Sequence, residues 1–363
     1  FAKHTMLCGQ SGSGKTYGLG RLVEQLMLQT KIRIVIIDPN SDFSHLHELA
    51  DDLGKKAGNP ACGGMAYPDL VAKHADLCPD IARYTLAPDA PGGAKPLRLL
   101  LSDVPTDALP ALLRLDPASD TTKFAQLRAI LTRFEGKKTT AGALDQAIRS
   151  STDSAAHHIR NIGLLSWPVW SDDQTSSCLD GLDHHRVCVY DIGSLGSQEE
   201  QWLVSVALLQ RLWPARTKRE PVLVVVDEAH TVCSATPSGP LAAMATDKMV
   251  QIAGEGRKYG LYLLAATQRP GKVHESLISQ CDNLALMRMT SSSDLDRVQA
   301  MCSYAPAGMA RQAARFSKGE VLLAGSFVNC PVLAKFGGRW TKQGGTDVGL
   351  DWICGPQSVR TDD

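Results

Sequence analysis

The chain has 363 residues, 44% of them hydrophobic, which is enough to bury one large core. Lysine plus arginine and aspartate plus glutamate number 38 each, so the formal net charge is zero and any contact with nucleic acid would need a local basic patch. No apolar run approaches the roughly 20 residues that span a bilayer, and the ten cysteines include no C-x-x-C pair. These features exclude a uniformly basic nucleic-acid binder, and the given sequence contains no run that predicts a membrane-spanning segment. They favour a cytoplasmic protein with reduced thiols.

The first fifty residues predict a strand, a glycine-rich loop, a helix and a second strand. Residues 4–8 are a short apolar run, and apolar side chains recur from Leu19 to Met27 at the spacing of one helical face. Residues 32–37 are rich in β-branched side chains and precede a proline. This order is a βαβ unit, which implies a parallel sheet.

The next part of the chain is less regular. Residues 51–185 contain glycine and proline clusters, and helical patterns occur at 107–115, 122–134 and 141–165. We expect this segment to be a mostly helical insertion or subdomain. Strands are predicted again at 187–192, 222–226, 261–266, 284–287, 320–325 and 331–336, with helices at 202–213, 241–258 and from about 294.

The chain is therefore expected to have four parts. The first part of an α/β core spans 1–50, the insertion 51–185, the rest of the core with its C-terminal strands 186–340, and a tail 341–363.

Residues 9–16 match the phosphate-binding pattern G-x-x-x-x-G-K-[ST] in full. Glycines let successive backbone N–H groups turn around a phosphate, and the helix that starts there points the positive end of its dipole at the same anion. Lys15 would reach the β- and γ-phosphates, and the Thr16 hydroxyl would bind Mg²⁺. The sequence thus predicts that ATP is held by Gly9, Gln10, Ser11, Gly12, Ser13, Gly14, Lys15, Thr16 and Tyr17.

Two carboxylates, Asp227 and Glu228, directly follow the apolar run 222–226. A carboxylate at the end of such a strand is delivered to Mg²⁺, which suits Asp227, while Glu228 would polarise the attacking water. The pair could instead cap a helix, but beside a phosphate loop we favour the catalytic interpretation. His230 follows closely and is expected to be structural or to support this pair.

Further polar residues lie on both sides of the run 261–266. Gln268 is a candidate to contact both the attacking water and the γ-phosphate, unless it is an ordinary loop amide. Arg257 and Lys258 lie at a predicted helix end, where they could simply complement the helix dipole. Alternatively, Arg257 is an arginine finger that stabilises the transition state in a neighbouring subunit.

Several separated motifs, in order, make the chain resemble the HerA branch of the HerA/FtsK ATPases. Beside the phosphate loop they lie at 36–43, 224–230, 255–260, 266–270 and 279–283, and 335–339 resembles that group's tail. The resemblance implies a RecA-like (ASCE) P-loop ATPase core with a mostly parallel sheet, a helical insertion and a C-terminal β extension.

The resemblance also implies a homohexameric ring that uses ATP and Mg²⁺ to move duplex DNA through its pore, with Arg257 acting in trans. A nuclease, or in some bacterial relatives an anti-phage effector, is the implied partner. Asp38 and Asp42 match acidic positions that help order the site. Two departures stand out: the phosphate loop begins at residue 9 of this sequence, whereas the family usually carries an N-terminal β-barrel before it, and Gly254 stands where a basic residue often occurs.

Three functions remain open at this point. The first is a DNA-translocating motor of helicase type that works with a nuclease or defence effector, which we expect. The second is an ATP-gated scaffold for an effector, which the zero net charge favours. The third is a secretion- or conjugation-type ATPase. Candidate pore cations, which could also be an ordinary solvated face, are Lys137, Lys138, Arg128 and Arg133.

Overall fold

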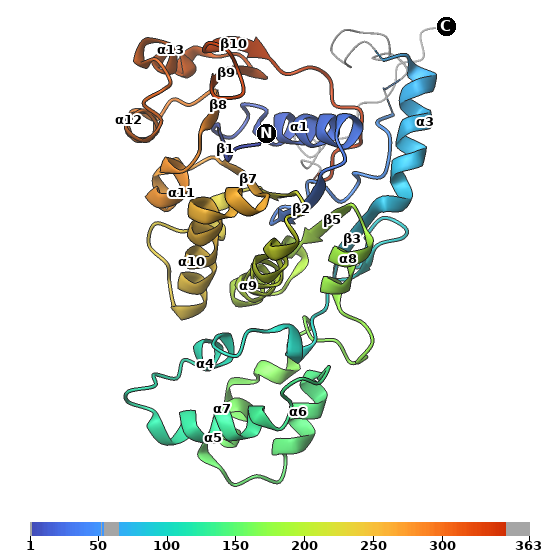
Figure 1. Cartoon of the computed structure of the whole chain (residues 1–363), viewed down its shortest axis with the longest axis vertical. Helices are drawn as coiled ribbons and strands as arrows, with labels where there is room; N and C mark the ends of the chain where they lie inside the picture. Colours follow the sequence, from blue (N-terminus) through green and yellow to red (C-terminus); the bar gives the residue numbers. More distant parts are fainter. Residues whose placement is uncertain (1, 52, 54–64, 346–363) are drawn as a thin grey trace, which may run out of the picture.

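The computed structural model describes residues 2–51, 53 and 65–345, which build one ten-stranded sheet (Figure 1). Its spatial order is β10-β9-β8-β1-β7-β6-β2-β5-β3-β4. The pairs from β8 to β4 are parallel, whereas β9 runs antiparallel to both β8 and β10. The strands are β1 (Thr5–Cys8), β2 (Arg33–Asp38), β3 (Ile81–Thr85), β4 (Lys95–Pro96), β5 (Val187–Asp191), β6 (Val222–Val226), β7 (Leu261–Thr267), β8 (Asn283–Met287), β9 (Glu320–Gly325) and β10 (Val332–Lys335). The predicted α/β fold with a C-terminal β extension is confirmed.

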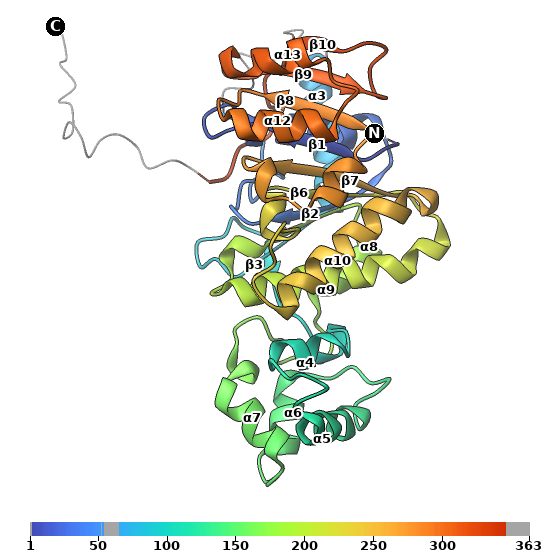
Figure 2. The same ribbon diagram turned by 90° about the vertical axis from the view of Figure 1, so that its left-hand side faces the viewer.

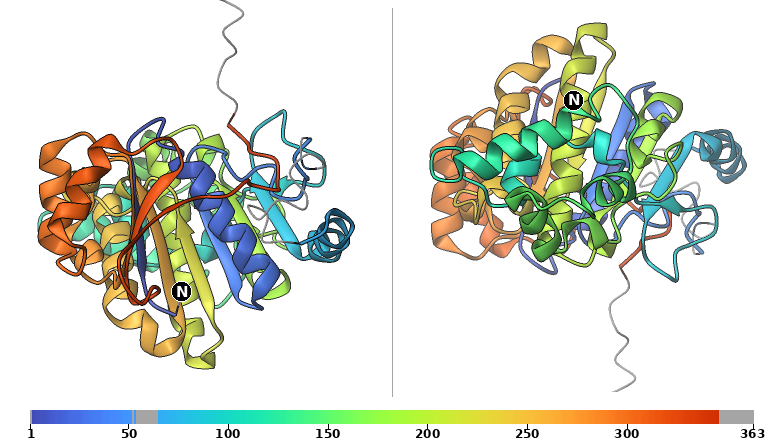
Figure 3. Two further views of the ribbon diagram at one scale, coloured as in Figure 1. Left: turned by 90° about the horizontal axis from the view of Figure 1, so that it is seen from above. Right: turned by 90° about the horizontal axis from the view of Figure 1, so that it is seen from below.

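Helices cover both faces of the sheet, as Figures 2 and 3 show. Leu7 packs with Leu19 of α1 (Lys15–Gln29) on one face, while Met6 points into the cluster on the other face. Because successive side chains of a strand alternate between faces, a central strand covered on both faces is mostly apolar, and all of β6 is buried. The second face is covered by α9 (Gln198–Ala215), α10 (Pro240–Glu255), α11 (Glu275–Ser279), α12 (Ser292–Met301) and α13 (Ala307–Arg311).

Four helices form a lobe at the end of the molecule opposite β9 and β10 (Figures 1 and 2). Two chain segments that run side by side join it to the core: Leu99 N–H donates to the Val169 carbonyl, and Ser171 N–H donates to the Leu99 carbonyl, both at 2.8 Å. Apolar side chains of the lobe, such as Leu127 and Ile159, belong to the same buried cluster as the core. The lobe helices are α4 (Ala108–Leu112), α5 (Thr121–Thr132), α6 (Ala141–Ile148) and α7 (Ser154–Ile162).

The segment expected to be a mostly helical insertion also contributes to the sheet. Besides α3 (Tyr67–Leu77), it holds β3, which pairs with β5, and the short β4. Strand β3 escaped the sequence analysis because a charged residue, Arg83, interrupts its apolar run. Arg83 is buried and donates to the Ser44 carbonyl at 2.9 Å, so burial does not require an apolar side chain here. The division of the chain into domains remains a prediction.

The remaining helix, α8 (Gly181–His184), leads into β5. Within 2–51, 53 and 65–345, no helix combines the length and apolar character that a bilayer crossing needs. Of the predicted tail, 341–363, only residues up to 345 are described.

After β10 the chain crosses α1, and its described part reaches the turn that follows β2, where Gly344 N–H donates to the Asp42 carbonyl at 3.1 Å (Figure 3). Glu24 of α1, which has no exposed surface, accepts hydrogen bonds from Thr341 N–H at 2.8 Å and from Trp340 N–H at 3.1 Å. Arg339 is 1% exposed and its Nε lies 3.4 Å from Glu24 Oε1, and Arg21 Nη1 lies 3.6 Å from Oε2. Glu24 therefore holds the crossing segment onto the helix that carries the phosphate loop.

We expect Glu24→Ala to lower the free energy of unfolding by about 3–5 kcal/mol, because it leaves the buried Arg339 and two backbone donors without their acceptor. Glu24→Gln should cost less, since the amide oxygen can still accept from Thr341. Urea unfolding of the two variants measures this, with the exposed Glu199→Ala as control. A change below about 1 kcal/mol for Glu24→Ala would mean that the ion pair behaves like a surface pair.

Candidate functional site

The glycine-rich loop follows β1 at the carboxyl edge of the parallel strands and leads into α1. Gly12 and Gly14 have φ angles of +73° and +90°, a left-handed backbone conformation that residues other than glycine rarely adopt. Gly14 is also the N-cap of α1, so the free N–H groups of the first helical turn face the space above the loop. All the predicted nucleotide-binding residues, Gly9 to Tyr17, lie in this loop or in that first turn.

Lys15 and Thr16 meet Asp227 at the start of α1. Lys15 Nζ hydrogen-bonds Asp227 Oδ1 and lies 3.1 Å from Glu228 Oε1, and Thr16 Oγ1 donates to Asp227 Oδ2 at 3.3 Å. Burial lowers the pKa of Lys15, but the charges of Asp227 and Glu228 outweigh it and raise that pKa, so Lys15 is a cation. The adjacent Thr16 hydroxyl and Asp227 carboxylate fit Mg²⁺, which takes oxygen ligands and keeps several waters.

Glu228 stands between Lys15 and the end of β7. Its φ of +45° is rare for a residue with a side chain and marks backbone strain at this position. Gln268 donates from Nε2 to Glu228 Oε1 at 2.6 Å and from its backbone N–H to Oε2 at 3.2 Å. His230 Nδ1 lies 3.3 Å from Oε2 and 3.2 Å from Thr267 Oγ1. The carboxylate is thus held from three sides.

These neighbours keep Glu228 ionised. Burial alone would raise the pKa of Glu228, but the hydrogen bond with His230 and the charge of Lys15 outweigh it and lower that pKa to about 2. The structure therefore brings the separately predicted Lys15, Thr16, Asp227, Glu228 and Gln268 into one cluster.

A second group of carboxylates lies behind this cluster, at the ends of β2 and β5. Asp38 is fully buried and accepts the N–H groups of Phe43 at 2.8 Å and Asp42 at 3.2 Å, so it shapes the turn after β2. Burial, with nearby carboxylates adding to it, raises the pKa of Asp38 to about 8 and that of Asp42 to about 7. Asp191, which the sequence analysis overlooked, pairs with Asp38 across the strands and accepts from Ser41 Oγ at 2.8 Å.

Arg257 lies at the opposite edge of the sheet from this cluster. It belongs to the turn Gly256–Tyr259 ahead of β7, whereas Gln268 follows β7. The seven residues of that strand, at about 3.3 Å each, separate the two edges by roughly 20 Å. The Arg257 side chain is 51% exposed and its Nη1 donates to Asp282 Oδ2 at 2.8 Å. Within one subunit, then, Arg257 is out of reach of the phosphate loop.

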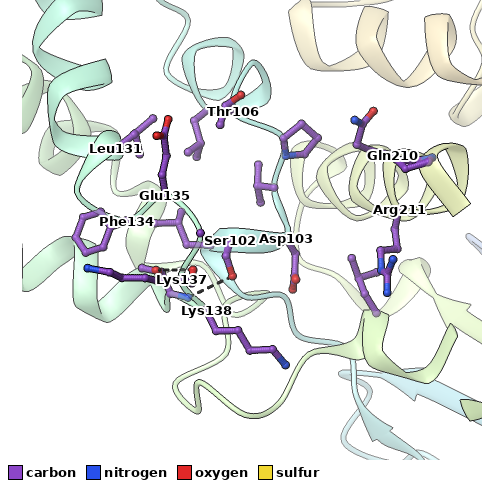
Figure 4. Close-up of a pocket in the computed structure, with 18 residues that line it drawn as sticks. Ser102, Asp103, Thr106, Leu131, Phe134, Glu135, Lys137, Lys138, Gln210 and Arg211 are labelled. Carbon is purple, nitrogen blue, oxygen red and sulfur yellow. Dashed lines mark hydrogen bonds between the residues drawn. The ribbon is translucent and has the colours of Figure 1, made fainter. Parts of the chain in front are cut away.

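The candidate pore cations lie on the lobe. Lys137 and Lys138 line a cavity of about 630 Å³ between the lobe and α9, opposite Arg211 (Figure 4). Lys138 and Arg211 are each paired with a carboxylate, at 3.5 and 2.6 Å, so the cavity gathers little net positive charge. Arg128 and Arg133 are exposed elsewhere on the lobe.

Groups that hold the loop from outside were not predicted. Arg288 directly follows β8 and donates from Nη2 to the Gly12 carbonyl at 3.1 Å. Gly319, just ahead of β9, donates from its N–H to the Ser13 carbonyl at 2.9 Å. No sequence pattern marks these positions. The predicted strand 284–287 was a partial indication, because a strand that is parallel and adjacent to β1 ends beside the loop.

Comparison with known proteins points to one family. Residues 1–211 match the family model described as the central domain of helicase HerA. The chain is similar to the DNA double-strand break repair helicase HerA of Pyrococcus furiosus, with 32% identity over 138 residues, and to that of Sulfurisphaera tokodaii, with 29% over 142 residues. The matches cover 36% and 39% of this chain, but only 24% and 28% of those relatives.

Solved structures share the fold. VirB4 of Thermoanaerobacter pseudethanolicus aligns with a TM-score of 0.59 at 14% identity, covering 92% of this chain and 88% of VirB4. The plasmid coupling protein TrwB, solved with ADP and Mg²⁺, aligns with a TM-score of 0.55 at 12% identity, covering 94% and 87%. These likenesses show a RecA-like fold. Since the family model matches more than half of the 363 residues, the chain belongs to the helicase HerA central-domain family, in the HerA-like branch of the HerA/FtsK P-loop ATPases.

Proposed function

We propose that the chain binds and hydrolyses ATP as a subunit of a homohexameric ring that moves duplex DNA. One observation carries the enzymatic part: three chain segments, around Lys15, Glu228 and Gln268, converge into one hydrogen-bonded cluster beside the glycine-rich loop. Membership of the HerA family supports the DNA-handling and ring-forming parts. As in the sequence-based expectation, we propose a cytoplasmic protein that works with a nuclease or a defence effector.

In this mechanism the N–H groups of the loop and Lys15 bind the β- and γ-phosphates of ATP. Thr16 and Asp227 would hold Mg²⁺, which would neutralise charge that develops on the phosphate oxygens. Glu228 accepts a hydrogen bond from the attacking water and thereby points a lone pair of the water oxygen toward the γ-phosphorus. Gln268, which already donates to Glu228, keeps the carboxylate in that orientation and marks the position of the γ-phosphate.

The low pKa of Glu228 suits a residue whose basicity depends on ATP. Part of the shift comes from the positive charge of Lys15, 3.1 Å away. When Lys15 turns toward the phosphates, its contribution falls and the pKa of Glu228 rises. Glu228 therefore becomes a better proton acceptor when the phosphates of the nucleotide draw Lys15 away.

Two features support a site shared between subunits. Arg257 is half-exposed and lies at the sheet edge opposite the loop, so that its guanidinium can meet only the ATP of another subunit. Its partner Asp282 is also partly exposed, at 34%, so the ion pair lies at the surface, where another subunit can meet it. A ring in which this edge faces the loop of the next subunit gives Arg257 the role of an arginine finger.

We expect duplex DNA to stimulate ATP turnover, and the stimulation to weaken steeply between about 50 and 200 mM salt, because phosphate contacts release counterions. Steady-state ATP hydrolysis with and without duplex DNA measures this, with Lys15→Ala as the inactive control. The zero formal net charge favours a second candidate function, an ATP-gated scaffold for an effector. ATP turnover that is the same with and without DNA at low salt would contradict the motor and support the scaffold.

A further inference from the structure

The glycine-rich loop is held from its outer side by residues of the C-terminal third of the chain. Besides the bonds that Arg288 and Gly319 make to the Gly12 and Ser13 carbonyls, Thr290 donates to Gln10 Oε1 from its N–H at 2.8 Å and from its hydroxyl at 2.7 Å. We call Arg288, Thr290 and Gly319 the outer clamp. Arg288 and Thr290 follow β8, and Gly319 directly precedes β9.

The outer clamp determines which way the peptide groups of the loop point. In a peptide unit the C=O and the following N–H point in opposite directions. Because the Gly12 carbonyl points outward to Arg288, the Ser13 N–H points inward, where it meets the Gln10 carbonyl at 3.1 Å. In the same way, the bond from Gly319 to the Ser13 carbonyl turns the Gly14 N–H inward. The Ser13 N–H thereby closes the turn from Gln10 to Ser13, and an inward Gly14 N–H is the kind of group that an anion-binding loop requires.

Of these two peptide groups, Arg288 holds the one between Gly12 and Ser13. Gly12 has no side chain, so the Gly12–Ser13 peptide can rotate with little steric cost, and its carbonyl would then face the phosphates. A charged donor makes a stronger hydrogen bond than a neutral one, so Arg288 opposes that rotation. In the described part of the chain, Arg288 Nε is buried without a partner, which leaves the Nη2–Gly12 bond as the polar contact that orients the guanidinium.

We infer that Arg288 is a positioning residue of the nucleotide site: it holds the loop in its anion-binding shape through the Gly12 carbonyl, and thereby sets the affinity for the phosphates common to ATP and ADP. The inference rests on the proposed ATP binding. It differs from the role of Lys15, because Arg288 acts on the outer face of the loop and does not need to touch the γ-phosphate.

The test is the affinity of Arg288→Ala for ATP and for ADP, each with Mg²⁺, measured by titration calorimetry. We expect both dissociation constants to rise by about the same factor, on the order of 10- to 100-fold for loss of a bond to a charged donor. Arg288→Lys should recover part of the affinity, and added guanidinium chloride at millimolar concentration should recover part of it for Arg288→Ala. Thr290→Val, which keeps the backbone bond, should cost less.

Controls separate this inference from the proposed function. Arg311→Ala, an exposed arginine on α13, should bind like the wild type, and the unfolding midpoint of Arg288→Ala without nucleotide shows whether the variant is folded. Equal affinity of wild type and folded Arg288→Ala overturns the inference. So does a loss confined to ATP, which would mean direct contact with the γ-phosphate. A wild type that binds no nucleotide overturns the proposed function instead.

Discussion

Glu228→Gln is expected to bind ATP as tightly as the wild type and to turn it over about 10²- to 10⁴-fold more slowly, the range that positioned proton transfer contributes. Glutamine keeps the size of the side chain and one oxygen that can accept from Gln268, so the contact between the two strand ends persists. It cannot accept a proton from water. The variant should therefore be trapped with ATP bound, which pre-steady-state hydrolysis and nucleotide binding measure separately.

The matched control for this variant is Glu199→Gln, an exposed carboxylate at the start of α9 that should leave turnover unchanged. Asp227→Asn provides a contrast. Because Asp227 contacts both Lys15 and Thr16, its loss should weaken the binding of the Mg²⁺–ATP complex as well as turnover. Normal hydrolysis by Glu228→Gln would remove Glu228 from its proposed role and point to another base, for which His230, 3.3 Å from Glu228, is a candidate.

The order of strands, loop and helices in the core was predictable because each element has a local signal. Strands β1, β2 and β6 are apolar runs that end in a glycine-rich loop or in carboxylates, and near-continuous apolar runs are typical of strands buried on both faces. The cluster around Lys15 was predictable for the same reason, since the carboxyl ends of adjacent parallel strands meet at one edge of the sheet.

What the sequence did not reveal depends on contacts between distant segments. Strand β3 contains Arg83, whose burial makes sense only because carbonyls of another loop lie next to it. Glu24 reads as an ordinary helical glutamate, yet it is fully buried because residues 339–341 cross the helix. Arg288 and Gly319 bond to the backbone of the glycine-rich loop, which accepts hydrogen bonds whatever its side chains are, so no residue pattern records the contact.

Arg257→Ala is expected to lower turnover in the proposed ring by about 10³-fold or more, the effect typical of an arginine finger, while nucleotide affinity changes little. The neighbouring Lys258→Ala is the matched control, because it removes a cation from the same turn. Its effect should be small, since Lys258 only complements the helix dipole. Equal, small losses from both substitutions would reduce Arg257 to that electrostatic role.

Mixed rings test whether Arg257 acts between subunits. A site that takes its phosphate loop from an Arg257→Ala subunit and its arginine from a Lys15→Ala subunit has every functional group, although neither variant is active alone. If each site lies between two neighbouring subunits of a closed ring, random mixing of equal amounts places both intact groups in about a quarter of the sites. Activity should thus rise from near zero in either homogeneous ring to a measurable fraction of the wild type. Since the length of β7 separates Arg257 from Lys15 within one chain, activity that stays at the level of the parent variants would mean that Arg257 does not take part in hydrolysis at all.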